Sequence, residues 1–218
     1  EYDASLAADA VAEQEGAHDN GANANATPAG GAPGTSGTLA AAKSSSASRA
    51  KAALEQSTAF VREHDLVTLP DAPVDIILMP EFQRGVAVAY CDSPGPLDKN
   101  LKTFYAVSPI PDDWNEKQVD SFLREYNSRM IHLLSIHEGT PGHYLEGWHS
   151  AKFPSTLRAV LRSGLFAEGW AVYTERMMQE QGYLDNDPLF HLVQLKFYLR
   201  TISNAILESV PIPSKGDV

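Results

Sequence analysis

The sequence is poor in cysteine, in long apolar runs and in positive charge. Its single cysteine, Cys91, cannot form an internal disulfide, which excludes a disulfide-stapled miniprotein. No run approaches the roughly 18 apolar residues of a membrane-spanning helix, so we expect no membrane span. Only 17 basic residues stand against 28 acidic ones, giving a net charge of −11. This balance disfavours nucleic acid and anionic membrane surfaces as partners.

Two properties stay open at this stage. The chain begins at Glu1 with neither an initiator Met nor the apolar core of a signal peptide, so export and a cytoplasmic location are both compatible with it. Nothing in the sequence indicates the oligomeric state.

The first 48 residues differ in composition from the rest. Residues 1–14 are rich in Ala and acidic residues and predict a helix, whereas residues 15–48 consist mostly of Gly, Ala, Asn, Ser, Thr and Pro. Such a segment cannot bury enough apolar surface to offset its ordering entropy, so we predict a disordered linker or insertion. One folded domain is expected over residues 49–210, followed by a frayed tail over residues 211–218.

The expected fold class is mainly α, with a small antiparallel β-sheet. Three short segments with strand character lie between Pro- and Gly-containing turns: residues 74–79, 85–91 and 101–107. Apolar residues at helical spacing predict five helices: residues 49–61, 115–137, 155–163, 166–181 and 189–208. Asn115 and Gln118 resemble a capping box at the start of the second helix. The last helix is apolar around most of its circumference, so we expect it to be buried.

Residues 137–143 (HEGTPGH) contain the parts of a zinc hydrolase site, two imidazoles and a carboxylate beside the first. In the metalloprotease signature HExxH the histidines are four residues apart, so one helical face presents both to one ion. Six residues on a regular helix turn through about 600°, which leaves the two side chains roughly 120° apart. Pro141 and Gly142 both interrupt helices. We therefore predict a bulge or break between Thr140 and His143 that lets both histidines face one ion.

A hydrolytic zinc site needs a third protein ligand and an open position for water. Glu168, in the segment EGWAVYTE, is the best candidate, because the 25 residues that follow His143 leave room for a turn, a short helix and a return (168 − 143 = 25). We expect Gly169 to permit close helix approach and Trp170 to shield the site from water. Glu175 shares a helix face with Glu168 and is predicted to accept a hydrogen bond from a ligand imidazole.

Glu138 is the expected general base, because a carboxylate next to a ligand can take a proton from a bound water and pass it to the leaving amine. Four residues are candidates for stabilising the oxyanion, the last less favoured: Tyr173, Tyr198, Arg200 and Tyr144. We favour Tyr198 with Arg200, because an Arg among the apolar residues of a buried helix needs an explanation.

Several alternatives stay open. His149 repeats the six-residue interval after His143 and is the main rival ligand, and His132 is a weaker one. Arg200 can instead serve in a structural ion pair. A non-catalytic module with a structural or vestigial metal site is a second hypothesis, favoured if His149 closes the coordination as a fourth protein ligand. A metal-dependent hydrolase of a non-peptide amide is a third.

The motifs HEGTPGHYLE and EGWAVYTE together resemble the bacterial domain-of-unknown-function family 885, whose signature reads HExxPGHxxQ followed by EGWAxYxE. The resemblance extends upstream through EHDLVTLPD and PEFQRGVAVAY and downstream through LVQLKFYLRTISNAILE, from about residue 55 to residue 208. Glu146 departs from the pattern, because the family tends to have Gln there.

This resemblance implies a zincin-like fold related to the gluzincin peptidases. It also implies Zn²⁺ as the cofactor, held by His137, His143 and Glu168, with Glu138 as the base and a peptide as the substrate. Family members are considerably longer than this chain, with a large helical N-terminal portion and a C-terminal extension. The resemblance therefore also implies a fragment or a shortened member.

Overall fold

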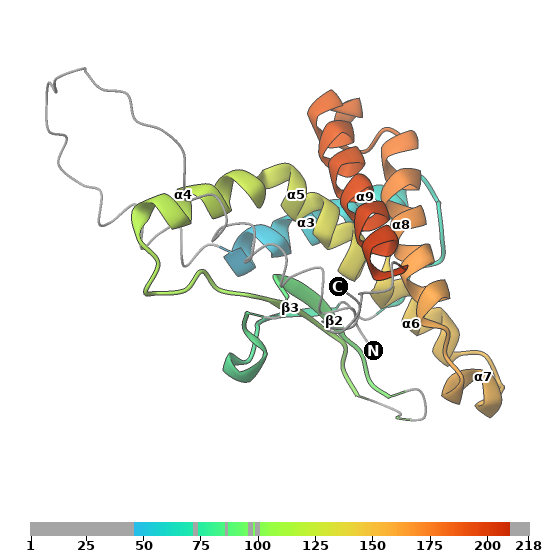
Figure 1. The fold of residues 1–218 in the computed structure, drawn as a ribbon. Helices are drawn as coiled ribbons and strands as arrows, with labels where there is room; N and C mark the ends of the chain where they lie inside the picture. The colour runs from blue at the N-terminus through green and yellow to red at the C-terminus, as the bar shows by residue number, and fades with distance from the viewer. Residues whose placement is uncertain (1–45, 72–73, 86, 96–97, 99–100, 210–218) are drawn as a thin grey trace, which may run out of the picture.

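The computed structural model describes residues 46–71, 74–85, 87–95, 98 and 101–209. The predicted helix over 1–14, the predicted tail over 211–218 and most of the predicted linker over 15–48 lie outside these residues. The described part is mainly helical with one small sheet, as the sequence predicted (Figure 1). Residues 46–48 belong to the first helix and not to the linker, because a formed helix adds further residues at low cost.

The sheet contains three strands in the order β1–β3–β2. They are β1 (Asp75–Leu78), β2 (Ala89–Asp92) and β3 (Phe104–Val107). The central strand β3 pairs antiparallel with β2 but parallel with β1, so the prediction of an antiparallel sheet was wrong. A parallel pair needs a long crossover connection. The chain from β1 through the 3₁₀ helix η1 (Glu81–Gln83) and β2 supplies that length.

Helix α3 (Ser46–Glu63) packs against the sheet and forms the first of two cores. Its Ala50 and Leu54 contact a cluster that includes Tyr105 and Val107 of the central strand. Tyr105 is 1% exposed, and its hydroxyl lies 3.4 Å from the hydroxyl of Ser135. This core therefore joins the sheet to the segment that carries the HEGTPGH motif.

The helix predicted over residues 115–137 is divided into shorter pieces. Helix α4 (Glu116–Glu125) begins at the predicted capping box, in which Asn115 makes both expected hydrogen bonds. The chain then turns at Asn127, whose side-chain oxygen accepts from the first backbone N–H groups of α5 (Ser128–Leu134). An Asn side chain that bonds the backbone in this way favours a new helix start. The prediction of one continuous helix was wrong because apolar spacing alone does not reveal such a cap.

The second core lies among α3, α5 and two long helices, α8 (Gly164–Glu180) and α9 (Pro188–Ser209), which stand side by side in Figure 1. Helix α6 (His143–Ala151) and the short α7 (Thr156–Val160) lead into α8, and the turn η3 (Tyr183–Asn186) joins α8 to α9. The fully buried members of this core are Val61, Met130, Leu133, Ile136, Met178, Tyr183 and Phe190. No helix of the described ranges has both the length and the apolar character to span a membrane.

The prediction that the last helix is buried was wrong for one of its faces. Phe190 and Gln194 of α9 are buried, at 0% and 4% exposure. The opposite face exposes large apolar side chains: Leu189, Leu192, Leu195, Leu199, Ile202, Ile206 and Leu207. The described neighbours α5 and α8 pack on one side of α9 only, and a sequence pattern cannot show on which sides a helix has neighbours.

Candidate metal centre

A π-helix places the first half of the motif. Helix α5 continues into η2 (Ser135–Gly139), which carries His137 and Glu138 in its wider turn. Thr140 is then extended, with φ −114° and ψ 121°, and α6 begins at His143. The helix is therefore interrupted between Thr140 and His143, as the sequence predicted. Single π-turns of this kind occur frequently at functional sites.

Gly142 allows the two histidine-bearing segments to approach closely. Its N–H donates a hydrogen bond of 2.9 Å to the carbonyl of Ile136. A Cβ atom at this position would lie 1.9 Å from the carbonyl oxygen of His137, which is closer than real Cβ atoms come. As a result the rings of His137 and His143 lie 4.7 Å apart between centroids, nearly perpendicular at 87°. Only glycine fits this approach.

Helix α8 brings Glu168 against both histidines. One carboxylate oxygen of Glu168 lies 3.4 Å from Nε2 of His137, and the other lies 3.4 Å from Nε2 of His143. The donor atoms of the three residues all lie within 4.8 Å of one another. Two zinc ligands at tetrahedral angles and about 2.1 Å from the ion are about 3.4 Å apart. The spacing of the carboxylate to each imidazole thus suits a zinc ion.

The chemistry of these donors also fits a metal ion. Nε2 of His143 is buried and makes no hydrogen bond within the described part of the chain, although buried polar atoms normally have a partner. Imidazole nitrogen is a good ligand for zinc. The side chain of Glu168 is 42% exposed, whereas those of His137 and His143 are 9% and 8% exposed. The cluster therefore opens toward solvent on the Glu168 side.

Glu175 fixes the orientation of His137. Its oxygen Oε1 lies 2.6 Å from Nδ1 of His137, which is the contact predicted between Glu175 and a ligand imidazole. Burial lowers the pKa of His137, but the hydrogen bonds with Glu168 and Glu175 raise this pKa well above its ordinary value. For Glu168 the directions are reversed. Burial raises the pKa of this carboxyl group, but the hydrogen bonds and charges of the two histidines together lower this pKa well below its usual range. The cluster therefore favours a positive charge, which a proton or a metal ion can supply.

Glu138 is a buried carboxylate beside the cluster, with an exposure of 1%. Its negative charge raises the pKa of His137 after the larger effects of burial, Glu168 and Glu175. On the sheet side, burial raises the pKa of the Cys91 thiol to about 12, and the charge of Glu138 acts in the same direction. Glu138 thus lies between the predicted ligands and the strands, within electrostatic reach of both.

The two residues favoured for the oxyanion differ in their surroundings. Burial raises the pKa of Tyr126, and the charge of Arg200 and a hydrogen bond with it lower this pKa, so Arg200 lies beside this ring. Tyr198 is 45% exposed. Arg200 therefore already interacts with a residue outside the predicted ligand set, and Tyr198 is partly open to solvent.

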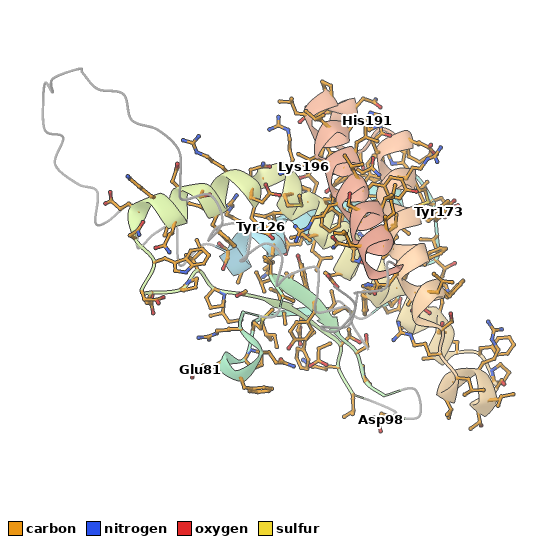
Figure 2. All side chains as sticks on the ribbon, in the orientation of Figure 1. Glu81, Asp98, Tyr126, Tyr173, His191 and Lys196 are labelled. Carbon is orange, nitrogen blue, oxygen red and sulfur yellow. The ribbon has the colours of Figure 1, made fainter. Side chains whose placement is uncertain are left out.

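The remaining residues of the two motifs have different surroundings. The indole N–H of Trp170 donates a 2.9 Å hydrogen bond to the carbonyl of Pro141 and so ties α8 to the motif loop. Tyr173, labelled in Figure 2, is 55% exposed, and its ring lies 5.8 Å from that of Trp170. Tyr144 is buried in the first core. A Cβ atom at Gly169 would meet no atom within 4 Å, so the predicted close helix approach at this glycine was wrong.

The two rival histidines are engaged elsewhere. His149 donates a 3.0 Å hydrogen bond to the carbonyl of Thr68, and Nδ1 of His132 lies 2.8 Å from the hydroxyl of Tyr183. Within the described ranges, the one group of three metal-type donors this close together consists of the predicted ligands, with no fourth member. The arrangement is that of an open site and not of a closed one.

No role was predicted for Glu146 from the sequence. Its buried carboxylate accepts hydrogen bonds from Ser150 at 2.6 Å and from Arg162 at 2.7 Å. Because Glu146 follows His143 by three residues on α6, this ion pair ties the ligand-bearing helix to the chain after α7. In the sequence, the difference from the family's Gln at position 146 was the signal that could have pointed to this ion pair.

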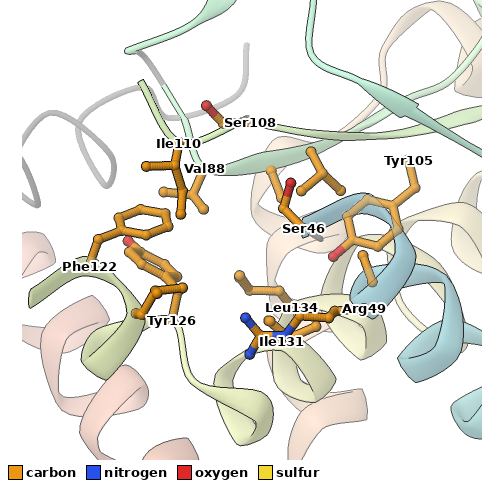
Figure 3. Close-up of a pocket in the computed structure, with 14 residues that line it drawn as sticks. Ser46, Arg49, Val88, Tyr105, Ser108, Ile110, Phe122, Tyr126, Ile131 and Leu134 are labelled. Carbon is orange, nitrogen blue, oxygen red and sulfur yellow. The ribbon is translucent and has the colours of Figure 1, made fainter. Parts of the chain in front are cut away.

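A separate apolar hollow lies between α3, α4, α5 and the sheet (Figure 3). Its walls include Val88, Tyr105, Ile110, Phe122 and Leu134, with the Arg49 guanidinium among the polar lining groups. None of the predicted metal ligands lines it. The hollow is therefore distinct from the candidate metal centre.

Comparisons with known proteins identify the family. The family described as "Bacterial protein of unknown function (DUF885)" matches residues 18–209, so the chain belongs to this family. No curated protein matches the chain.

Two solved structures are similar. The first is a candidate lipoprotein of unknown function from Shewanella oneidensis, 29% identical with a TM-score of 0.66, and the match covers 94% of this chain. It covers only 36% of the Shewanella chain, so the present chain spans about a third of that protein. A candidate lipoprotein from Colwellia psychrerythraea is 22% identical with a TM-score of 0.45, over 75% of this chain and 25% of that one.

Proposed function

We propose that this chain carries the metal site of a zinc-dependent metallopeptidase. The observation that supports the proposal is the triangle of His137, His143 and Glu168, whose donor atoms lie within 4.8 Å of one another. A buried carboxylate, Glu138, stands next to the first ligand, and the cluster is open on the Glu168 side. Two imidazoles, one carboxylate and an open position are typical of hydrolytic zinc sites.

In this proposal His137, His143 and Glu168 are the zinc ligands, and Glu175 fixes which nitrogen of His137 carries the proton. The Nε2 atoms of His137 and His143 and the carboxylate of Glu168 would hold the ion. Zinc bound there would polarise a carbonyl group and lower the pKa of a bound water to about 7. Glu175 accepts a hydrogen bond from the Nδ1–H group of His137, which leaves Nε2 of that ring free to act as a ligand.

The proton transfers are assigned to Glu138. It takes the proton from the attacking water and delivers it to the leaving amine of the cleaved peptide bond. Tyr198 and Arg200 are the proposed partners of the oxyanion. Because Arg200 interacts with Tyr126 in the free protein, it would have to change partners when substrate binds.

Of the two alternatives, a structural metal site is less well supported, and a hydrolase of non-peptide amides would use the same residues. A structural metal site would need a fourth protein ligand, and none accompanies the three donors in the described part of the chain. A hydrolase of non-peptide amides would use the same triangle and base. The similarity to a candidate lipoprotein supports an exported location, which is also a proposal.

Metal analysis with three variants tests the proposal. The purified chain is loaded with zinc, freed of excess and compared with His143→Ala, Glu138→Gln and the control His149→Ala. We expect one zinc per wild-type chain, almost none in His143→Ala, and full occupancy in the other two. Hydrolysis of a peptide library should fall by about 10²- to 10⁴-fold in Glu138→Gln and stay unchanged in His149→Ala.

Each component of the proposal has an outcome that removes it. A wild-type chain without stoichiometric zinc would refute the metal site, and full hydrolysis by Glu138→Gln would refute the base. Loss of zinc in His149→Ala with retention in His143→Ala would reassign the ligand. Turnover of acyl amides but not of peptides would favour the non-peptide hydrolase.

A further inference from the structure

Helix α9 exposes a regular row of aliphatic side chains. The row consists of Leu192, Leu195, Leu199, Ile202 and Ile206, which are 61%, 48%, 63%, 40% and 58% exposed. Their spacings alternate between three and four residues. This alternation averages 3.5 residues, the spacing with which one helix packs along another in a coiled coil. We call these five residues the α9 seam.

The seam is a second apolar face on a helix whose first apolar face is already covered. Phe190 is fully buried, and Val193 and Phe197 pack against the second core. The ring of Phe197 lies 6.4 Å from that of His137, so α9 also backs the candidate metal centre. A contiguous row of five half-exposed aliphatic side chains is a feature that often marks an interaction surface.

The residues beside the seam favour a protein partner over a membrane. On one flank stand His191, Tyr198 and Ala205, and on the other Lys196 and Ser203. Lys196 is the one ion among these five, and it already pairs with Glu125 of α4. A helix that binds an anionic membrane surface carries several Lys or Arg residues beside its apolar face. The seam lacks them, and its 3–4 spacing suits another helix.

We propose that the α9 seam is the docking surface for an amphipathic helix from polypeptide of the kind that the Shewanella relative carries outside the shared fold. The Shewanella relative holds this fold within a chain of which the match covers only 36%. The larger part of that polypeptide therefore lies outside the shared fold and is available to cover such a face. The occupant supplies a row of aliphatic residues at the same 3–4 spacing. This inference does not depend on the proposed zinc chemistry.

The test uses the purified 218-residue chain and, as the probe, the portion of the Shewanella lipoprotein that lies outside the match, produced separately. We compare wild type with Leu195→Glu/Leu199→Glu, with the single change Leu199→Glu, and with the control Phe82→Glu. Phe82 is 84% exposed on η1, whose Glu81 lies far from His191 and Lys196 of α9 in Figure 2. Circular dichroism checks that each variant keeps its helix content.

We expect a saturable one-to-one complex between the chain and the probe in sedimentation velocity and titration calorimetry. Binding should weaken at least tenfold in Leu199→Glu, disappear in the double variant and remain unchanged in Phe82→Glu. Absence of a complex, or a complex that the double variant retains, overturns the proposal. A dimer of the chain itself that the double variant dissociates also overturns it, because the seam would then belong to a second copy. Zinc content is measured in parallel and separates a failure of this inference from a failure of the metal site.

Discussion

Replacing Gly142 by alanine tests how the motif loop positions the two histidines. The added Cβ would lie 1.9 Å and 2.4 Å from the carbonyl oxygens of His137 and Ile136, and 2.6 Å from the carbonyl carbon of His137. Contacts under 3.0 Å are essentially never seen, and all three atoms belong to the backbone. Rotation of a side chain therefore cannot relieve these contacts, and the backbone of the loop has to move by about 1 Å (3.0 − 1.9 = 1.1).

This movement is large compared with the tolerance of a metal site. Zinc–ligand distances are held within about 0.2 Å, so a displacement of 1 Å between His137 and His143 exceeds the tolerance about fivefold. We expect Gly142→Ala to weaken zinc binding at least 100-fold, which corresponds to about 2.7 kcal/mol. Overpacking should also lower the free energy of unfolding by about 1–3 kcal/mol.

Two other glycines of the same region serve as matched controls. A Cβ at Gly139 would meet only the end of the Leu54 side chain, at 2.4 Å, which can rotate. A Cβ at Gly169, directly beside Glu168, would meet nothing within 4 Å. Gly139→Ala should therefore keep most of its zinc affinity. Gly169→Ala should keep all of it and gain up to about 1 kcal/mol of stability from higher helix propensity.

The assay combines competition with a fluorescent zinc chelator and unfolding in urea. We expect the alanine variants at positions 169 and 139 to bind zinc more tightly than the variant at position 142. A Gly142→Ala protein whose zinc affinity stays within threefold of wild type would refute it. So would an equal loss in Gly169→Ala, because that glycine has open space around it.

Two further predictions concern carboxylates. The Glu175→Gln variant should keep its fold but bind zinc about 10- to 100-fold more weakly, because Glu175 orients His137 through a 2.6 Å hydrogen bond. Unchanged zinc affinity in the chelator assay would contradict this role. Asp187 accepts hydrogen bonds from the backbone of Leu189 and from Arg129, and both lower its pKa. Its stabilisation is therefore present above the unfolded pKa of about 3.9 and is lost as pH falls through the lowered folded value. The difference in thermal stability between wild type and Asp187→Asn should be present at pH 7 and shrink at pH 3, and a gap that widens in acid would count against the argument.

Short-range preferences explain which structural predictions succeeded. Pro141 and Gly142 constrain their own backbone, so the interruption before His143 could be predicted from the sequence. The capping box at Asn115 is equally local and is present. Asn127 acts locally too, but its cap lies inside a continuous apolar pattern, and the periodicity concealed the break that it makes.

Long-range packing explains the errors. The parallel pairing of β1 with β3 depends on which strands meet, and strand patterns do not specify partners. The seam on α9 has the same apolar character as the buried face of that helix, so the sequence could not distinguish the two. The ion pair of Glu146 with Arg162 spans 16 residues and a change of direction, and no periodicity indicates it.

By itself, the sequence determined which chemical groups are available: two imidazoles with an interrupted helix between them, and a segment with carboxylates further along. These follow from residue types and from the local backbone limits of proline and glycine. Only the tertiary structure decided that Glu168 comes within 3.4 Å of both histidines, that Glu175 bonds His137, and that one face of α9 stays uncovered. Such contacts join residues far apart in the chain, and they depend on how whole helices pack rather than on any preference of the residues themselves.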